Sequence, residues 1–210
     1  MEILISLVSL LCLILAITFH EFCHALAADR LGDPTPRSLG RLTLNPLAHA
    51  DPIGTFLLPL FSALSGIPTI GWAKPVPIDP FNFRKPKRDE IITSLAGPLS
   101  NLSLAIASSL FLRFIPINSP IASYILYIFI LINISLSIFN LIPIPPLDGS
   151  HIFLNLLPEN SRLKWEEAFR QYGFILLILL IFFPLGRQSI LSTIMSPIIS
   201  WSLKLLLPSL

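Results

Sequence analysis

Charged residues are scarce in this sequence. Lys, Arg, Asp and Glu together make up 12% of its 210 residues, about half of the roughly 25% found in soluble domains. Apolar residues make up 53%, and the mean hydropathy is +0.77. This composition excludes a water-soluble globular domain, which needs a charged surface, and a disordered chain, which has few apolar residues. We therefore expect an integral membrane protein.

The sequence also lacks a strong net charge and a pair of cysteines placed for a disulfide. The formal net charge is +2, and no basic stripe with interleaved aromatic residues is present, so no nucleic-acid partner is expected. Cys12 and Cys23 lie on one apolar stretch, about 16 Å apart along a helix. That separation is too long for a disulfide between them.

What the chain does contain is a series of apolar stretches interrupted by some of its 20 prolines. About 20 apolar residues span a bilayer, and the first three stretches approach or exceed that length. A charged helix at the membrane surface, residues 158–171, is expected before the last two, which are short or broken by proline. The five predicted spans are residues 3–28, 91–112, 120–142, 174–185 and 190–207.

A further apolar stretch, residues 53–72, is broken by Gly54, Pro59, Gly66 and Pro68. It could cross the membrane or dip in and return. If it dips, 12 of the 14 Lys and Arg residues fall on one side of the membrane, as the positive-inside rule expects for the cytoplasmic side. The expected fold is all-α and polytopic, with a three-helix core, a re-entrant or short membrane segment and two C-terminal membrane helices.

The first apolar stretch carries His20-Glu21-Phe22-Cys23-His24, which fits the pattern H-E-x-x-H. At 100° per residue both imidazoles leave one face of a helix about 40° apart. This arrangement suits two zinc ligands, with Glu21 beside them to take a proton from a zinc-bound water. A cluster that merely hydrogen-bonds is disfavoured, because each ionisable group in a membrane span costs about 2.5–3.5 kcal/mol.

Asp148 is the expected third zinc ligand, because it is the one carboxylate at the end of another span. If residues 53–72 dip, spans 3–28 and 120–142 run in the same direction and bring His20 and Asp148 to the same face. Three prolines between residues 143 and 146 unwind the chain there, and Gly149 permits a close turn. The alternative is a simple Asp-Gly turn.

These residues resemble a known family, the site-2 proteases, which are zinc metalloproteases that cut inside membranes. The resemblance covers about residues 5–155, and the run from Gly71 to Pro77 is similar to a subgroup of small bacterial members. Three motifs in this order carry it: His20-Glu21-x-x-His24, then Gly97-Pro98-Leu99-Ser100-Asn101, then Asn140-Leu141-Ile142-Pro143 leading into Pro146-Leu147-Asp148-Gly149.

The resemblance implies one catalytic zinc ion, bound by His20, His24 and Asp148, with Glu21 as the general base. It implies a single membrane-embedded protease domain, residues 1–210 with a catalytic core at about 3–155, and no PDZ or nucleotide-sensing module. The implied partners are the lipid bilayer and a transmembrane segment of a membrane-anchored substrate. The implied location is a bacterial inner membrane, with the active site toward the cytoplasm.

Several alternatives stay open at this point. Asn101 and Asn140 match family asparagines near the active site and could hold the scissile peptide, or they could form interhelical hydrogen bonds worth about 0.6 kcal/mol. His151 and Cys23 could approach the metal. A catalytically inactive helix-binding protein and a metal transporter are the rival functions, although the ligand set and its base are complete here.

Overall fold

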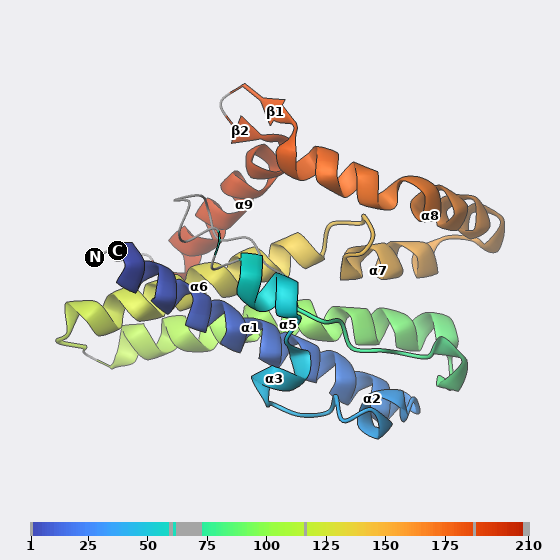
Figure 1. The fold of residues 1–210 in the computed structure, drawn as a ribbon, viewed down its shortest axis with the longest axis horizontal. Coiled ribbons are helices and arrows are strands. Elements are labelled where there is room, and N and C mark those ends of the chain that lie inside the picture. The colour runs from blue at the N-terminus through green and yellow to red at the C-terminus, as the bar shows by residue number, and fades with distance from the viewer. Residues whose placement is uncertain (1, 59–60, 62–72, 116, 187, 208–210) are drawn as a thin grey trace.

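The computed structural model describes residues 2–58, 61, 73–115, 117–186 and 188–207. It is built of helices with one small two-stranded hairpin (Figure 1), as the all-α prediction requires. In chain order the elements are α1 (Glu2–Leu31), α2 (Thr35–Ser38), α3 (Pro46–His49), the π-helical turn η1 (Pro52–Leu57), the 3-10 turn η2 (Pro80–Asn82), α5 (Pro86–Phe114), α6 (Pro120–Asn140), α7 (Asp148–Leu156), α8 (Glu159–Phe182), β1 (Pro184–Leu185), β2 (Gln188–Ser189) and α9 (Ile190–Leu206).

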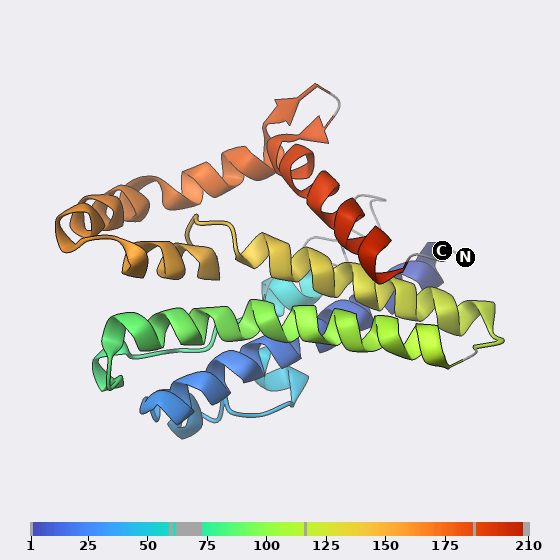
Figure 2. The same ribbon diagram turned by 180° about the vertical axis from the view of Figure 1, so that it is seen from behind.

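Three long helices, α1, α5 and α6, pack side by side (Figures 1 and 2). Within the described ranges, these three are long and apolar enough to cross a membrane, and the apolar α9 is shorter, at 17 residues. Helices α1 and α6 run in the same direction and α5 runs opposite to them (Figure 1). The end of α1 and the start of α5 therefore lie at one end of the bundle, and α7 runs toward that end (Figure 1).

The ends of the long helices have local causes in the sequence. Gly32 takes a φ of +115°, and the next amide donates to the carbonyl of Ala28 at 2.9 Å, which ends α1 with a left-handed residue of the kind that glycine adopts without strain. Proline occupies the first turn of α5 and of α6, where its missing N–H has no cost. The predictions for residues 3–28, 91–112 and 120–142 are confirmed, with the first two extended at both ends.

The chain turns sharply between α6 and α7, through the proline-rich segment that begins at Leu141. A Cβ added to Gly149 would lie 2.3 Å from the carbonyl oxygen of Leu141. Because only a residue without a Cβ fits there, Gly149 lets the first turn of α7 lie against the end of α6. That close turn directs Asp148, the first residue of α7, toward the three-helix bundle.

The C-terminal part differs in one respect from the sequence interpretation. The expected surface helix at 158–171 and membrane segment at 174–185 form one continuous helix, α8, because no proline lies between residues 159 and 182 and Gly173 alone does not end a helix. A hairpin of β1 and β2 then leads into α9. That α8 and α9 cross the membrane stays a prediction.

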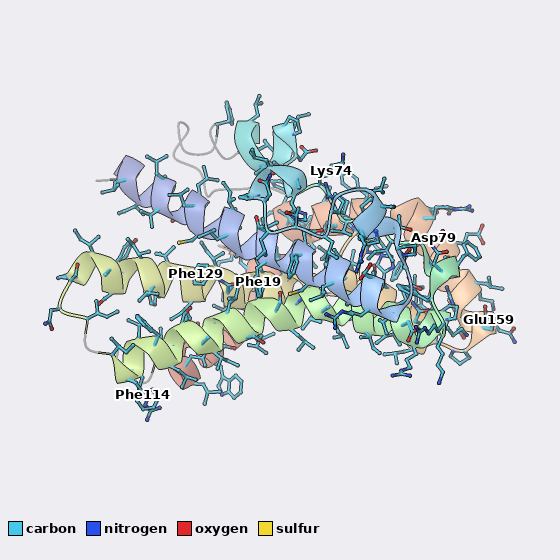
Figure 3. All side chains as sticks on the ribbon, turned by 90° about the horizontal axis from the view of Figure 1, so that it is seen from below. Phe19, Lys74, Asp79, Phe114, Phe129 and Glu159 are labelled. Carbon is cyan, nitrogen blue, oxygen red and sulfur yellow. The ribbon has the colours of Figure 1, made fainter. Side chains whose placement is uncertain are left out.

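The predicted re-entrant segment, residues 53–72, lies mostly outside the described residues. After it, residues 73–84 run beside α1, and we call this segment the strap; Figure 3 labels Lys74 and Asp79 on it. The buried carboxylate of Asp33 holds the far part of the strap, because it accepts hydrogen bonds from the amide of Asp79 at 2.8 Å and from Asn82 Nδ2 at 2.9 Å.

Candidate metal centre

The two histidines of the H-E-x-x-H motif project from one face of α1 and meet the carboxylate of Asp148 from α7. Both histidines are 5% exposed, and their Nε2 atoms lie 3.0 Å apart. Asp148 Oδ2 is 3.2 Å from His20 Nε2, and Asp148 Oδ1 is 3.3 Å from His24 Nε2. In the part of the chain that the structure describes, these three side chains form a group that could hold a metal ion.

Hydrogen bonds on the far side of each ring fix its tautomer. His20 Nδ1 lies 2.6 Å from Asn101 Oδ1, and His24 Nδ1 lies 2.7 Å from the carbonyl oxygen of Thr93. The amide group of Asn101 is oriented by its Nδ2, which donates to the carbonyl of Ala16 and to Asn133. Because both partners of the rings are acceptors, each Nδ1 carries the proton and each Nε2 presents a lone pair.

The donor set therefore fits a divalent cation. The Nε2 lone pairs of His20 and His24 face each other at 3.0 Å, and they repel unless a positive charge lies between them. In addition, Asp148 Oδ2 is buried without a hydrogen-bond donor among the described residues. Ligand atoms about 2.0–2.1 Å from a tetrahedral zinc ion are about 3.3–3.4 Å from one another, close to the separations observed.

Helix α5 approaches this centre at Gly97. A Cβ built there would lie 2.3 Å from His24 Nε2 and 2.6 Å from His20 Nε2. Gly97 is followed by Pro98 inside the helix, and one turn later Asn101 reaches His20. Gly97, which has no side chain, thus lets α5 lie directly against the two imidazoles. Asn101, one turn later, orients the imidazole of His20.

Glu21 lies on α1 between the two histidines, and the strap covers its carboxylate. Glu21 Oε2 accepts a hydrogen bond of 2.9 Å from the backbone amide of Val76. Within the described residues, no hydrogen bond is given to the other carboxylate oxygen, Oε1, and a carboxylate oxygen can accept a proton. A buried site with three converging ligands and an adjacent carboxylate has the groups needed for metal-assisted hydrolysis.

Comparison with known proteins agrees with this geometry. Residues 115–183 match the model of Peptidase family M50. The chain is 39% identical over 182 residues to "Putative zinc metalloprotease YwhC" of Bacillus subtilis, covering 83% of this chain and 80% of that protein. It is 34% identical over 175 residues to "Putative zinc metalloprotease Rip2" of Mycolicibacterium smegmatis, covering 81% of this chain and 65% of that protein.

This chain belongs to peptidase family M50, the site-2 protease family. It is a metalloprotease, and its long apolar helices make it a polytopic membrane protein of the all-α class. No solved structure matches the chain. The names of its relatives support zinc as the metal of this M50 protease.

The two asparagines expected near the active site of the M50 protease lie in different surroundings. Asn101 is fully buried and bonds directly to His20, so its contacts orient a predicted ligand. Asn140 donates from Nδ2 to the carbonyl of Leu136, one turn earlier on its own helix, at 3.0 Å. The hydrogen bond that the structure gives Asn140 therefore does not connect it to the histidines.

His151 and Cys23 are not part of the three-residue group. His151 Nδ1 lies 2.9 Å from Glu90 Oε1 at the start of α5, and the thiol of Cys23 interacts with Ser100. His151 thus ties α7 to α5 beside the centre. Within the described residues the candidate ligands stay His20, His24 and Asp148.

Sequence reasoning missed three participants in this M50 protease. Asn133 on α6 is fully buried and accepts from Asn101; a polar residue in the middle of an apolar span, two turns before Asn140, was the available signal. The carbonyl of Thr93 and the amide of Val76 are backbone groups. No residue type marks a backbone group for such a role, so only the fold reveals them.

Proposed function

We propose that this protein is an intramembrane protease, which hydrolyses a peptide bond within a transmembrane segment of a membrane-anchored protein. One zinc ion is held by His20, His24 and Asp148, and Glu21 is the general base. The observation that carries the proposal is the convergence of three lone-pair donors inside a bundle of apolar helices, with a carboxylate beside them.

The residues divide the chemistry among them. When bound, zinc acts as a Lewis acid that polarises a peptide carbonyl and makes water a nucleophile near neutral pH. Glu21 Oε1 accepts the proton of the attacking water and passes it to the leaving amine, while Oε2 stays bonded to Val76. Asn101 and Thr93 keep both imidazoles in the tautomer whose Nε2 is free to coordinate.

The substrate class follows from where the centre lies. His20 and His24 belong to a helix of 30 residues that is long and apolar enough to span the bilayer, so the bond to be cut has to reach membrane depth. A peptide bond in an intact helix is hydrogen-bonded and sterically shielded. We therefore expect substrates whose transmembrane segment carries helix-breaking residues near the scissile bond.

We further propose that residues 1–210 act as one membrane-embedded domain with its catalytic core at about 3–155. The positive-inside distribution supports a site facing the cytoplasmic side of a bacterial inner membrane. Helices α1 and α6 run in the same direction (Figure 2), and Asp148, which follows α6, lies 3.2–3.3 Å from the histidines of α1.

The test uses the purified full chain in detergent, with bound zinc measured by elemental analysis and cleavage followed on a single-span protein. Glu21→Gln keeps the volume of the side chain and an acceptor for Val76 but removes the base. We expect it to retain zinc and to lose about 10²–10⁴-fold in cleavage rate. Asp148→Ala should lose both zinc and cleavage.

Glu159→Gln is the matched control, because Glu159 is exposed and pairs with Lys87 on the surface. It should cleave at the rate of the unaltered protein. Cleavage that survives Glu21→Gln would refute the general-base role, and full zinc content in Asp148→Ala would refute the ligand set. Zinc flux into liposomes without proteolysis would favour a transporter instead.

A further inference from the structure

We propose that Arg41 is a positioning residue for the general base, acting through the strap. The inference rests on the proposed function, because it assigns Glu21 the role of base. Arg41 lies in the loop after α2, it is 6% exposed, and nothing in the three motifs points to it. Every hydrogen bond that the structure gives its guanidinium ends on a backbone carbonyl.

The guanidinium joins two segments of chain. Arg41 Nη2 donates to the carbonyl of Pro75 at 3.0 Å and also to the carbonyl of Lys74, while Nη1 donates to the carbonyl of Ala48. The planar fork of arginine can bind several acceptors in fixed directions at once, which a lysine ammonium cannot do. Arg41 thereby fixes the start of the strap against α3, the short helix that carries Ala48.

Val76, the next residue of the strap, makes the contact with the general base. Val76, 8% exposed, donates its amide hydrogen to Glu21 Oε2 at 2.9 Å. The carbonyl of Pro75 belongs to the same peptide unit as the amide of Val76, so Arg41 and Glu21 hold opposite sides of one rigid plane. Any displacement of that plane is passed directly to the carboxylate.

Burial and charge agree with this assignment. Burial lowers the pKa of the Arg41 guanidinium, and the negative charge of Glu21 opposes that shift, so the two charges act on each other although no direct hydrogen bond links them. A second buried anchor, Asp33, binds the far part of the strap through the amide of Asp79. Held at both ends, the strap presents the Val76 amide at a fixed position.

The first experiment needs neither zinc nor substrate. Pro75 and Pro77 have no amide hydrogen, so Val76 supplies the one exchanging amide of residues 75–77. In the zinc-free full chain we expect Arg41→Gln and Glu21→Ala to speed hydrogen exchange at Val76 by about tenfold or more. Arg37→Gln is the matched control, because Arg37 is an exposed arginine paired with Asp29. Unchanged exchange in Arg41→Gln overturns the proposal.

The second experiment measures cleavage kinetics. We expect Arg41→Gln to keep its zinc and KM and to lower kcat by about 10–100-fold, since misplacing a catalytic group by about 1 Å costs this much. Arg41→Lys should not restore kcat. A rise in KM with kcat unchanged, or a loss of zinc, overturns the proposal, because either places the role of Arg41 elsewhere than at Glu21.

A double-variant comparison identifies the route of the effect. Val76→Pro removes the amide hydrogen and leaves all three carbonyls that Arg41 binds, so it should lower kcat like Arg41→Gln. If Arg41 acts through this amide, the double variant is no slower than Val76→Pro alone. If the double variant lowers kcat by the product of the two single effects, the proposal is overturned. Should Arg41→Gln not fold, Arg41→Lys replaces it in both experiments with the same expected direction.

The two proposals fail in different ways. If the unaltered protein cleaves no membrane substrate, or if Glu21→Gln still cleaves, the proposed function is wrong. The exchange experiment on the zinc-free chain would then still report whether Arg41 holds the Val76 amide on Glu21. If cleavage depends on Glu21 but not on Arg41, the function stands and the positioning role does not.

Discussion

Gly97→Ala should destroy metal binding without unfolding the protein. The added Cβ would lie 2.3 Å from His24 Nε2, whereas real Cβ contacts are essentially never closer than 3.0 Å. The imidazole must therefore move by about 0.7 Å, the difference between these two distances, while coordination tolerates only about ±0.2 Å. Since losing a group that merely orients a ligand costs 10–100-fold in metal affinity, we expect a loss of about 100-fold or more.

The helix itself should tolerate the change, because alanine is favoured over glycine in a helix interior by about 0.5–1 kcal/mol. The assay is zinc affinity by competition with a chelator, alongside circular dichroism of the zinc-free protein. Ala107→Ser, on the exposed side of α5, also adds one heavy atom and should bind zinc normally. Zinc affinity equal to that of the unaltered protein in Gly97→Ala would refute the close approach of α5 to the histidines.

Three further predictions concern the surroundings of the centre. Asn101→Leu leaves Nδ1 of His20 without its acceptor, so zinc affinity measured by chelator competition should fall about 10–100-fold; unchanged affinity would mean that the 2.6 Å contact does not orient the ring. Burial raises the pKa of the Asp33 carboxyl, but hydrogen bonds from Thr35, the Asp79 amide and Asn82 lower it further, below the value of about 3.9 in an unfolded chain. The stability that this carboxylate contributes is thus complete above about pH 4 and is lost as the pH falls through the folded-state pKa. Melting temperatures between pH 5 and pH 3 should decline less steeply in Asp33→Asn, and an equal decline would contradict this. A chelator should abolish cleavage and zinc should restore it, whereas restoration by magnesium, which prefers oxygen ligands, would argue against the His-His-Asp set.

The sequence predicted the parts of the structure that depend on periodicity and on local chain chemistry. The spacing of His20 and His24 requires a shared helix face, and the prolines before Asp148 require a break after α6. Both features appear, and three side chains from two distant stretches meet as expected. The long helices were also predictable, because about 20 apolar residues in succession have few alternatives to a membrane span.

What the sequence could not predict depends on where backbone groups lie in space. The carbonyl of Thr93 and the amide of Val76 bind His24 and Glu21, yet every residue carries such groups. The sequence does not predict the continuous α8, because the change in composition near residue 172 resembles a boundary, although a helix can continue from a polar into an apolar segment. Asn140 matched a family motif, but its amide bonds within its own helix.

The order of the ligands along the chain has a consequence for synthesis. His20, Glu21 and His24 lie on α1, whereas Asp148 follows more than a hundred residues later, beyond α6. A ribosome-bound chain that has inserted only its first helices therefore holds two imidazoles and no third ligand. Under the proposed ligand set, the nascent polypeptide stays unable to cut its neighbours in the translocation channel until synthesis has passed α6 and reached Asp148.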